Sequence, residues 1–230
     1  TGECGWGGDW FGMSCDSESN VLVVGFWGFV SGTIPAELSL ISTLTSLSLS
    51  YTGLTGSIPP ELSALTAMVE LDLSLNALTG SIPPELSTLT ALKMLNLGED
   101  ELVGVIPPQL SMLTRLNFLH LNVNSLSGPV PPSLSALSEL RSLWLGVNEL
   151  AGTVPSVLST LTSLTSLRLH ENKLTGTIPS QLGALTSLRE LYLSSNQLTG
   201  SVPSELCAIG IQAFWVQRAR VECGCCPCCG

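Results

Sequence analysis

The stretch "SALTAMVELDLSLNALTGSIPPEL", residues 63–86, is one copy of a phrase that recurs through the chain. The copies align on a proline preceded by Ile or Val, and these prolines stand 24 residues apart throughout: Pro35, Pro59, Pro83, Pro107, Pro131, Pro155, Pro179 and Pro203. We number the copies as coils one to eight in this order. An unbroken period of this length is typical of a solenoid, in which each coil packs only on its neighbours.

Within coil three the apolar residues are Met68, Leu71, Leu73, Leu78, Ile82, Leu86 and Leu89. Leu71 and Leu73 stand two apart, which predicts a strand with both side chains on one face. Burying seven such side chains stabilises a coil by at most ~20 kcal/mol. Ordering the backbone of the coil costs more, at roughly 1–2 kcal/mol per residue. A coil therefore cannot stand alone, and we expect the coils to stack with their strands paired in parallel.

An asparagine recurs at one position of the repeat: Asn76, Asn124, Asn148, Asn172 and Asn196. We expect these amides to form an internal ladder that satisfies buried backbone groups of the turns. Gly28, Thr52 and Asp100 occupy the same position in three coils and are expected to break the ladder.

The consensus "LxxLxLxxNxLxGxIPxxLxxL", over residues 20–206, resembles the plant-type extracellular leucine-rich repeat. That family includes receptor-kinase ectodomains, receptor-like proteins and polygalacturonase inhibitors. The resemblance implies an α/β solenoid: a right-handed superhelix of eight coils with a parallel β-sheet on its concave face. It also implies short second strands from the "LxGxIP" phrase, 3₁₀ or short helical turns on the convex side, and disulfide-stabilised caps.

The two ends carry all the cysteines: Cys4, Cys15, Cys207, Cys223, Cys225, Cys226, Cys228 and Cys229. The segment "CGWGGDWFGMSC" is similar to the family's amino-terminal cap, and "ECGCCPCCG" resembles the cysteine-dense ending of repeat proteins from algae and related protists. We therefore divide the chain into a cap over 1–19, repeats over 20–206 and a cap over 207–230.

Disulfides are the favoured state of these cysteines, with Cys4 bridged to Cys15 and the pairing of the other six open. The alternative is zinc, because Cys223 and Cys226 have the spacing of zinc ligands. The cluster lacks a second pair at finger-like distance, so no metal is expected. Disulfides indicate an extracellular or cell-surface location.

The charge balance excludes two classes of partner. The net charge is −10 with only eight Lys and Arg, which argues against nucleic acid and against anionic membranes. The longest apolar run, residues 21–30, is half the ~20 residues that a membrane-spanning helix needs, so no transmembrane segment is expected.

If Leu167 and Leu169 point inward, Arg168 points outward on the concave face. The row at this offset is Val24, Ser48, Asp72, Asn96, His120, Trp144, Arg168 and Tyr192. With neighbouring rows, coils five to eight gather eight candidate ligand-binding residues: Phe118, His120, Trp144, Arg168, His170, Glu171, Glu190 and Tyr192. Exposed aromatic and arginine side chains anchor interfaces. The alternative is that these side chains only shield the strands.

No catalytic or cofactor-binding motif is present. His120 and His170 lie two coils apart, about 10 Å along the stack, and "HENKL" at 170–174 lacks the second histidine of a zinc-protease helix. We expect no enzyme activity and no cofactor.

The sequence thus predicts an extracellular module that binds a protein or peptide on the concave face of coils five to eight. One alternative is a structural subunit that self-associates in a cell wall or extracellular filament. Another is binding of ice or polysaccharide by two polar rows, which Val103, Val105, Pro129 and Ala151 interrupt. The first row is Ser31, Thr55, Thr79, Val103, Ser127, Ala151, Thr175 and Thr199, and the second is Thr33, Ser57, Ser81, Val105, Pro129, Thr153, Thr177 and Ser201.

Overall fold

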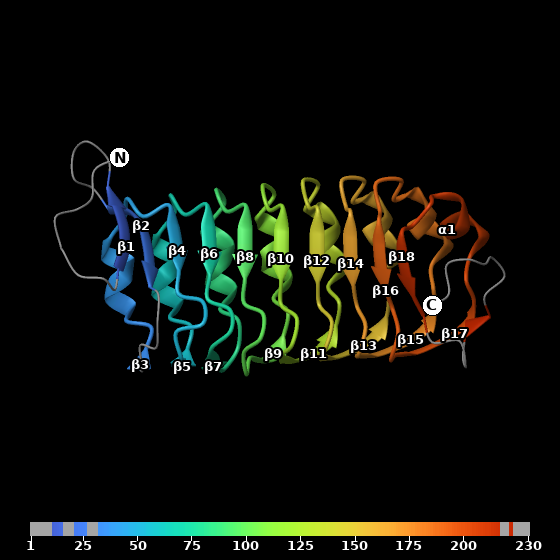
Figure 1. Ribbon diagram of the computed structural model, residues 1–230, viewed down its shortest axis with the longest axis horizontal. Coiled ribbons are helices and arrows are strands. Elements are labelled where there is room, and N and C mark those ends of the chain that lie inside the picture. The colour runs from blue at the N-terminus through green and yellow to red at the C-terminus, as the bar shows by residue number, and fades with distance from the viewer. Residues whose placement is uncertain (1–10, 16–20, 27–31, 217–220, 223–230) are drawn as a thin grey trace.

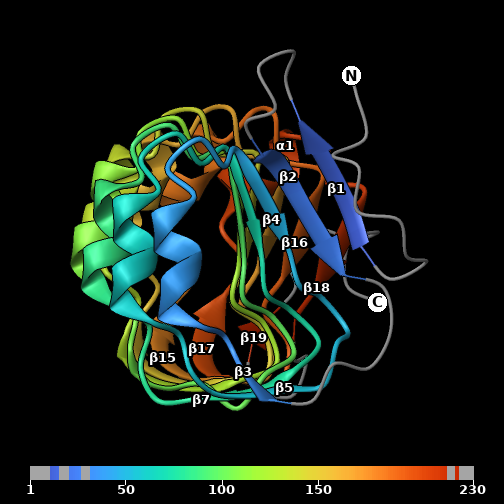
Figure 2. The ribbon, with the colours of Figure 1, turned by 90° about the vertical axis from the view of Figure 1, so that its left-hand side faces the viewer.

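The computed structural model describes residues 11–15, 21–26, 32–216 and 221–222. The coils stack along one long axis, and each coil contributes to three sides of the stack (Figures 1 and 2). One side is a long sheet, the second consists of shorter strands, and the third carries helical turns. Stacking of parallel strands confirms the predicted solenoid.

The long sheet, which we call the main sheet, corresponds to the sheet that the resemblance places on the concave face. Its order follows the chain: β1 (Phe11–Cys15), β2 (Val21–Phe26), β4 (Ser46–Ser48), β6 (Glu70–Asp72), β8 (Met94–Asn96), β10 (Phe118–His120), β12 (Ser142–Trp144), β14 (Ser166–Arg168), β16 (Glu190–Tyr192) and β18 (Ala213–Trp215). All neighbours are parallel except β1, which runs antiparallel to β2 at the amino-terminal end.

The second side consists of two shorter sheets. A three-stranded sheet contains β3 (Gly32–Thr33), β5 (Leu54–Ser57) and β7 (Ala77–Thr79). A six-stranded sheet contains β9 (Val103–Val105), β11 (Ser125–Pro129), β13 (Glu149–Thr153), β15 (Lys173–Thr177), β17 (Gln197–Ser201) and β19 (Val221–Glu222). An isolated bridge between Ser81 and Val103 joins them. The second side is therefore divided between coils three and four.

The third side carries 3₁₀ turns, and an α-helix in coil eight. They are η1 (Ala36–Leu40), η2 (Pro60–Ala64), η3 (Pro84–Thr88), η4 (Pro108–Met112), η5 (Pro132–Ala136), η6 (Ser156–Thr160), η7 (Ser180–Ala184) and α1 (Ser204–Ala208). Four turns, η2 to η5, begin with proline, because proline has the backbone angle of a first helical residue and needs no N–H partner there. None of the described helices is long and apolar enough to span a bilayer.

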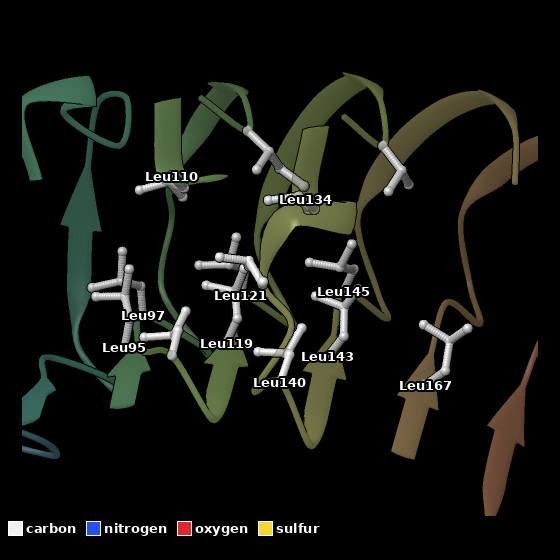
Figure 3. Close-up of a cluster of buried hydrophobic side chains, with 14 of the residues drawn as sticks. Leu95, Leu97, Leu110, Leu119, Leu121, Leu134, Leu140, Leu143, Leu145 and Leu167 are labelled. Atoms are coloured by element: carbon white, nitrogen blue, oxygen red, sulfur yellow. The ribbon is translucent and has the colours of Figure 1, made fainter. Parts of the chain in front are cut away.

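Leucines from all three sides fill the interior. Figure 3 shows part of this core, with leucines from the main sheet and from the turns η4 and η5. The seven apolar residues predicted for the core of coil three are each at most 1% exposed. Neighbouring coils cover them from both sides, as the energy argument required.

The strand register differs at the two ends of the main sheet. Interior strands pair with an offset of 24, as Leu143 does with Leu167, but Val24 pairs with Leu47 and Leu191 with Phe214. A shift of one residue moves a side chain to the opposite face of a sheet. Our placement of Val24 on the outer face was therefore wrong, because Val24 is buried.

Candidate binding face

Each strand of coils two to eight in the main sheet has three residues, of which the middle leucine enters the core and the first and third face outward. A residue with positive φ follows each strand; Val147 and Glu171 are examples. Because this turn repeats, third-position side chains of successive coils lie directly beside one another. Paired neighbours include His120 with Trp144, Trp144 with Arg168, and Arg168 with Tyr192.

These third-position side chains form a continuous stack. The rings of His120 and Trp144 are 3.9 Å apart between centroids and 6° from parallel. The Arg168 guanidinium carbon lies 4.0 Å from the Trp144 ring centroid and 5.1 Å from that of Tyr192. Tyr192 in turn stacks at 6.3 Å on Trp215. Both faces of Trp144 are thus covered, so its ring edge is the part open to a ligand.

Hydrogen bonds hold the stack from the first-position row. His120 Nε2 and Ser142 Oγ are 2.9 Å apart, and Trp144 Nε1 donates to Ser166 Oγ at 3.0 Å. Ser166 Oγ donates to Glu190 Oε2 at 2.9 Å. Ser142 and Ser166, which form these bonds with the two rings, are buried. The rings are therefore fixed in orientation before any ligand arrives.

Glu190 also forms an ion pair with Arg168. The same carboxylate oxygen, Oε2, accepts from Arg168 Nη2 at 2.8 Å and from Nε at 3.3 Å. The hydrogen bond from Arg168 is the main reason that the pKa of Glu190 is lowered. The arginine in the stack is thereby neutralised by a carboxylate.

The two histidines are uncharged near neutral pH. Burial, with a smaller contribution from the positive charge of Arg168, lowers the pKa of His120 to about 4. Burial also lowers the pKa of His170. With Arg168 paired to Glu190, the stack carries little net charge.

Of the eight candidate residues, the structure brings six together around this stack: Phe118, His120, Trp144, Arg168, Glu190 and Tyr192. Phe118 is 39% exposed and meets His120 edge-on. His170 lies in the next row, 5.8 Å from Tyr192 between ring centroids. Glu171 is exposed in the turn beyond the strand, where φ is 51°, so it stands apart from the stack.

His170 occupies space that only a glycine leaves open. A Cβ built on Gly146 would collide with the imidazole ring of His170. Gly146 and His170 hold the same repeat position in consecutive coils. The glycine of coil six thus leaves the space that the imidazole ring of coil seven occupies.

Sequence reasoning missed Trp215, which extends the stack and is 46% exposed. It stands 23 residues after Tyr192, so the 24-residue offset points to Val216 instead. The available signal was the apolar pair Phe214 and Val216, two residues apart, which repeats the core pattern of a strand. Strand β18 thus extends the main sheet into the segment assigned to the carboxyl-terminal cap.

The same rows in coils two to four have a different chemistry. Asp72 Oδ1 accepts from the Ser74 hydroxyl at 2.6 Å, and Asn96 Nδ2 donates to Ser74 Oγ at 3.0 Å. Ser46 Oγ lies 3.5 Å from Glu70 Oε2. This half of the face is a short polar network.

The Asn ladder forms as predicted. Asn124 Nδ2 donates to the carbonyls of Leu97 and Leu121, while its Oδ1 accepts from the Leu102 amide. Thr52 was predicted to break the ladder, but it is fully buried and its hydroxyl donates to the Leu49 carbonyl at 2.7 Å. Gly28 lies outside the described residues.

The polar rows lie on the second side. In the first row, hydroxyls donate to a glycine carbonyl of the preceding coil: Thr55 to Gly32, Ser127 to Gly104, Thr175 to Gly152 and Thr199 to Gly176. In the second row, Thr153 Cγ2 would lie 3.0 Å from a Cβ on Gly176. The glycine therefore lets adjacent coils approach closely. Ser31 lies outside the described residues.

Cys207 is disulfide-bonded. Cys4 and the five cysteines from Cys223 onward lie outside the described residues, so their bridges, and the pairing of Cys15, stay predictions. Among the described residues no group of three His, Cys, Asp or Glu is placed to hold a metal ion.

Family models for the leucine-rich repeat match residues 43–65, 68–89 and 138–198. The chain is a leucine-rich-repeat protein of the plant type. A search of curated proteins found no match.

Among solved structures, this leucine-rich-repeat chain is similar to the ectodomain of the Arabidopsis thaliana receptor kinase GASSHO1/SCHENGEN3, crystallised with CASPARIAN STRIP INTEGRITY FACTOR 2. The identity is 33% over 96% of this chain and 29% of that one, with a TM-score of 0.86. The Arabidopsis receptor kinase HAESA, in complex with the peptide hormone IDA and the co-receptor SERK1, is 31% identical over 94% and 41%, with a TM-score of 0.70.

A plant ice-binding protein is 29% identical over 96% of this chain and 78% of its own, with a TM-score of 0.75. The chain spans less than half the length of the two receptor chains.

Proposed function

We propose that this protein is an extracellular recognition module that binds a peptide or protein segment on the main-sheet face of coils five to eight. The observation that carries the proposal is the stack from His120 to Trp215, whose rings are partly exposed and in which His120 and Trp144 hydrogen-bond to buried serines. Aromatic and arginine side chains held in one conformation bind with little loss of conformational entropy.

The ring orientation favours a peptide over a sugar. A sugar ring binds an aromatic side chain through the open ring face, but Trp144 has His120 on one face and Arg168 on the other. The positively polarised ring edges remain, and these suit carbonyl oxygens and other aromatic rings. Receptor neighbours crystallised with a peptide hormone add support at the level of the family.

The charge of the site indicates the side chains it would accept. Arg168 is paired with Glu190, and His120 is neutral above about pH 5 because its pKa is about 4. A ligand with apolar or aromatic side chains therefore fits the stack better than a strongly charged peptide, which would find no free opposite charge there.

A displayed library of random 12-residue peptides tests this proposal. Selected peptides are measured by calorimetry against the wild type, Trp144→Ala and Ser48→Ala, the last being a change in the polar half of the same face. We expect enrichment of aromatic peptides, affinity reduced at least about 30-fold by Trp144→Ala, and no effect of Ser48→Ala. Failure to enrich any peptide, or equal affinities for all three proteins, would refute the proposal.

Ice binding through the second side is the alternative with a specific observation behind it. Four first-row hydroxyls, in coils two, five, seven and eight, donate to glycine carbonyls of the preceding coil, and a plant ice-binding protein is a structural neighbour. Freezing hysteresis of the wild type, Thr175→Asn and Trp144→Ala decides it. Hysteresis that only Thr175→Asn abolishes would establish ice binding, and a wild type without hysteresis would exclude it.

If the protein is instead a structural subunit of a cell wall or extracellular filament, it should self-associate. Light scattering over a range of concentrations measures self-association: a constant monomer mass excludes a filament subunit, whereas a mass that rises with concentration supports one.

The disulfide at Cys207 supports a location outside the cell, and fractionation of the native source with an antibody to this chain checks that location.

A further inference from the structure

Asp100 stands at the position of the Asn ladder in coil four, and it reproduces only the accepting half of the hydrogen bonds that an asparagine makes there. Its Oδ1 accepts from the Leu78 amide at 3.0 Å. In coil five, Asn124 Oδ1 accepts from Leu102 at the corresponding position, at 2.9 Å. The acceptor half of the site is therefore unchanged, and Asp100 Oδ2 takes the place that Nδ2 has in an asparagine.

In the other coils, the position of Asp100 Oδ2 is occupied by a hydrogen-bond donor. Nδ2 of Asn148 donates to the carbonyls of Leu121 and Leu145, and the same pattern holds at Asn172 and Asn196. The corresponding carbonyls around Asp100 are those of Leu73 and Leu97. Asp100 Oδ2 is buried without a hydrogen-bond partner in the described structure. An ionised carboxylate would thus direct lone pairs at carbonyl oxygens, whereas a protonated one would donate to them.

We propose that Asp100 is a neutral carboxylic acid inside the folded stack, and that its ionisation loosens the seam between coils three and four. The proton, carried on Oδ2, replaces one of the two amide hydrogens of an asparagine. On ionisation it passes to solvent, and the buried charge is left facing carbonyl dipoles.

The surroundings agree with this assignment. Burial raises the pKa of Asp100 to about 7, against the hydrogen bonds from the Leu78 and Asn76 amides that lower it. The charged groups whose fields reach it are Asp72 of β6 and Glu101 of its own coil, both acidic and both raising the pKa. The ladder residues of the coils on either side, Asn76 and Asn124, do not titrate.

The seam is also where the second side is divided. The three-stranded sheet ends with coil three and the six-stranded sheet begins with coil four, with Ser81 and Val103 forming the bridge between them. In a solenoid each coil contacts only its neighbours, so a weakened interface opens locally. Because the folded pKa lies above the unfolded value of 3.8, stability falls as pH rises from about 4 to about 7 and is constant above that.

Hydrogen exchange of the full chain tests the proposal. Amide protection over residues 97–104 is compared with that over 169–176, the equivalent segment around Asn172, at pH 5.0 and 8.5. The ratio within one sample removes the intrinsic effect of pH on exchange. We expect the relative protection of 97–104 to fall at least about tenfold at pH 8.5.

Two variants complete the design. Asp100→Asn restores the residue that other coils use, so it should fold and its protection ratio should be independent of pH. Glu101→Gln removes one of the two acidic charges that raise the pKa of Asp100, so it should keep the fall between pH 5.0 and 8.5 with the midpoint at a somewhat lower pH. A wild-type ratio that does not change with pH, or an equal fall in Asp100→Asn, would overturn the proposal. Neither outcome depends on what the main-sheet face binds.

Discussion

The main-sheet face has two halves with the same backbone and different chemistry. Coils two to four present Ser48, Asp72 and Asn96, whereas coils five to seven present His120, Trp144 and Arg168 at the same offset. The leucines beneath are equally buried in both halves: Leu71 is 1% exposed and Leu143 is 0% exposed. The repeat thus keeps the inward positions that stabilise the fold constant and lets the outward ones vary, and it is on these outward positions that we propose recognition.

The largest expected effect is a loss of stability that is equal for core variants in the two halves of the main-sheet face. Leu71→Ala and Leu143→Ala each remove a fully buried side chain and leave a cavity, so each should lower the free energy of unfolding by about 3 kcal/mol. Denaturant unfolding measures both. A much smaller loss for Leu71→Ala would mean that the polar half is packed less firmly than its burial indicates.

The second-largest expected effect is on peptide affinity, and it differs between the two halves of the face. Ala in place of Trp144 removes the ring that contacts both His120 and Arg168, and should weaken peptide binding by about 2 kcal/mol or more. The reciprocal change, Ser48→Trp, should add no affinity because its neighbours supply no stacking partner. Calorimetry with one selected peptide compares the two, and circular dichroism confirms that each variant is folded.

A smaller effect concerns protonation in the aromatic half. Since burial lowers the pKa of His120 to about 4 from the ordinary 6.5, the folded state binds this proton less well than the unfolded state does. Stability from this group is therefore present above pH 6.5 and is lost as pH falls toward 4. NMR titration of the imidazole should show no transition between pH 5.5 and 8. A midpoint near 6.5 would mean that the ring is not held in the stack.

The smallest expected effect is that of the ion pair. Arg168 and Glu190 are 30% and 36% exposed, so solvent screening limits the pair to about 1 kcal/mol or less. Glu190→Gln should reduce stability by that amount at pH 7. Because the pKa of Glu190 is lowered, the difference should vanish as pH falls through that folded-state value. Thermal unfolding at pH 7 and pH 3 measures the change.

Much of the fold follows from the period alone. The core of coil three and the Asn ladder were predicted because each depends on residue type at a fixed offset. Arg168 was correctly placed on the outer face, but its contacts with Trp144 and Glu190 depend on side-chain rotamers that spacing does not specify. Val24 was misplaced and Trp215 was missed because the offset changes to 23 at the ends. Thr52 shows that a hydroxyl can make one of the hydrogen bonds of the asparagine amide, the one donated to the Leu49 carbonyl.

The change of strand-pairing offset from 24 to 23 residues determines where whole coils could be added to the chain or removed from it. Between the two 23-residue junctions every coil is interchangeable in length, so a whole unit could be duplicated or deleted there without moving any inward leucine outward. A 24-residue unit placed across either junction would not match the 23-residue offset found there. The chain is therefore modular in its middle and fixed at its boundaries, and lineages of such proteins would be expected to differ in the number of central coils.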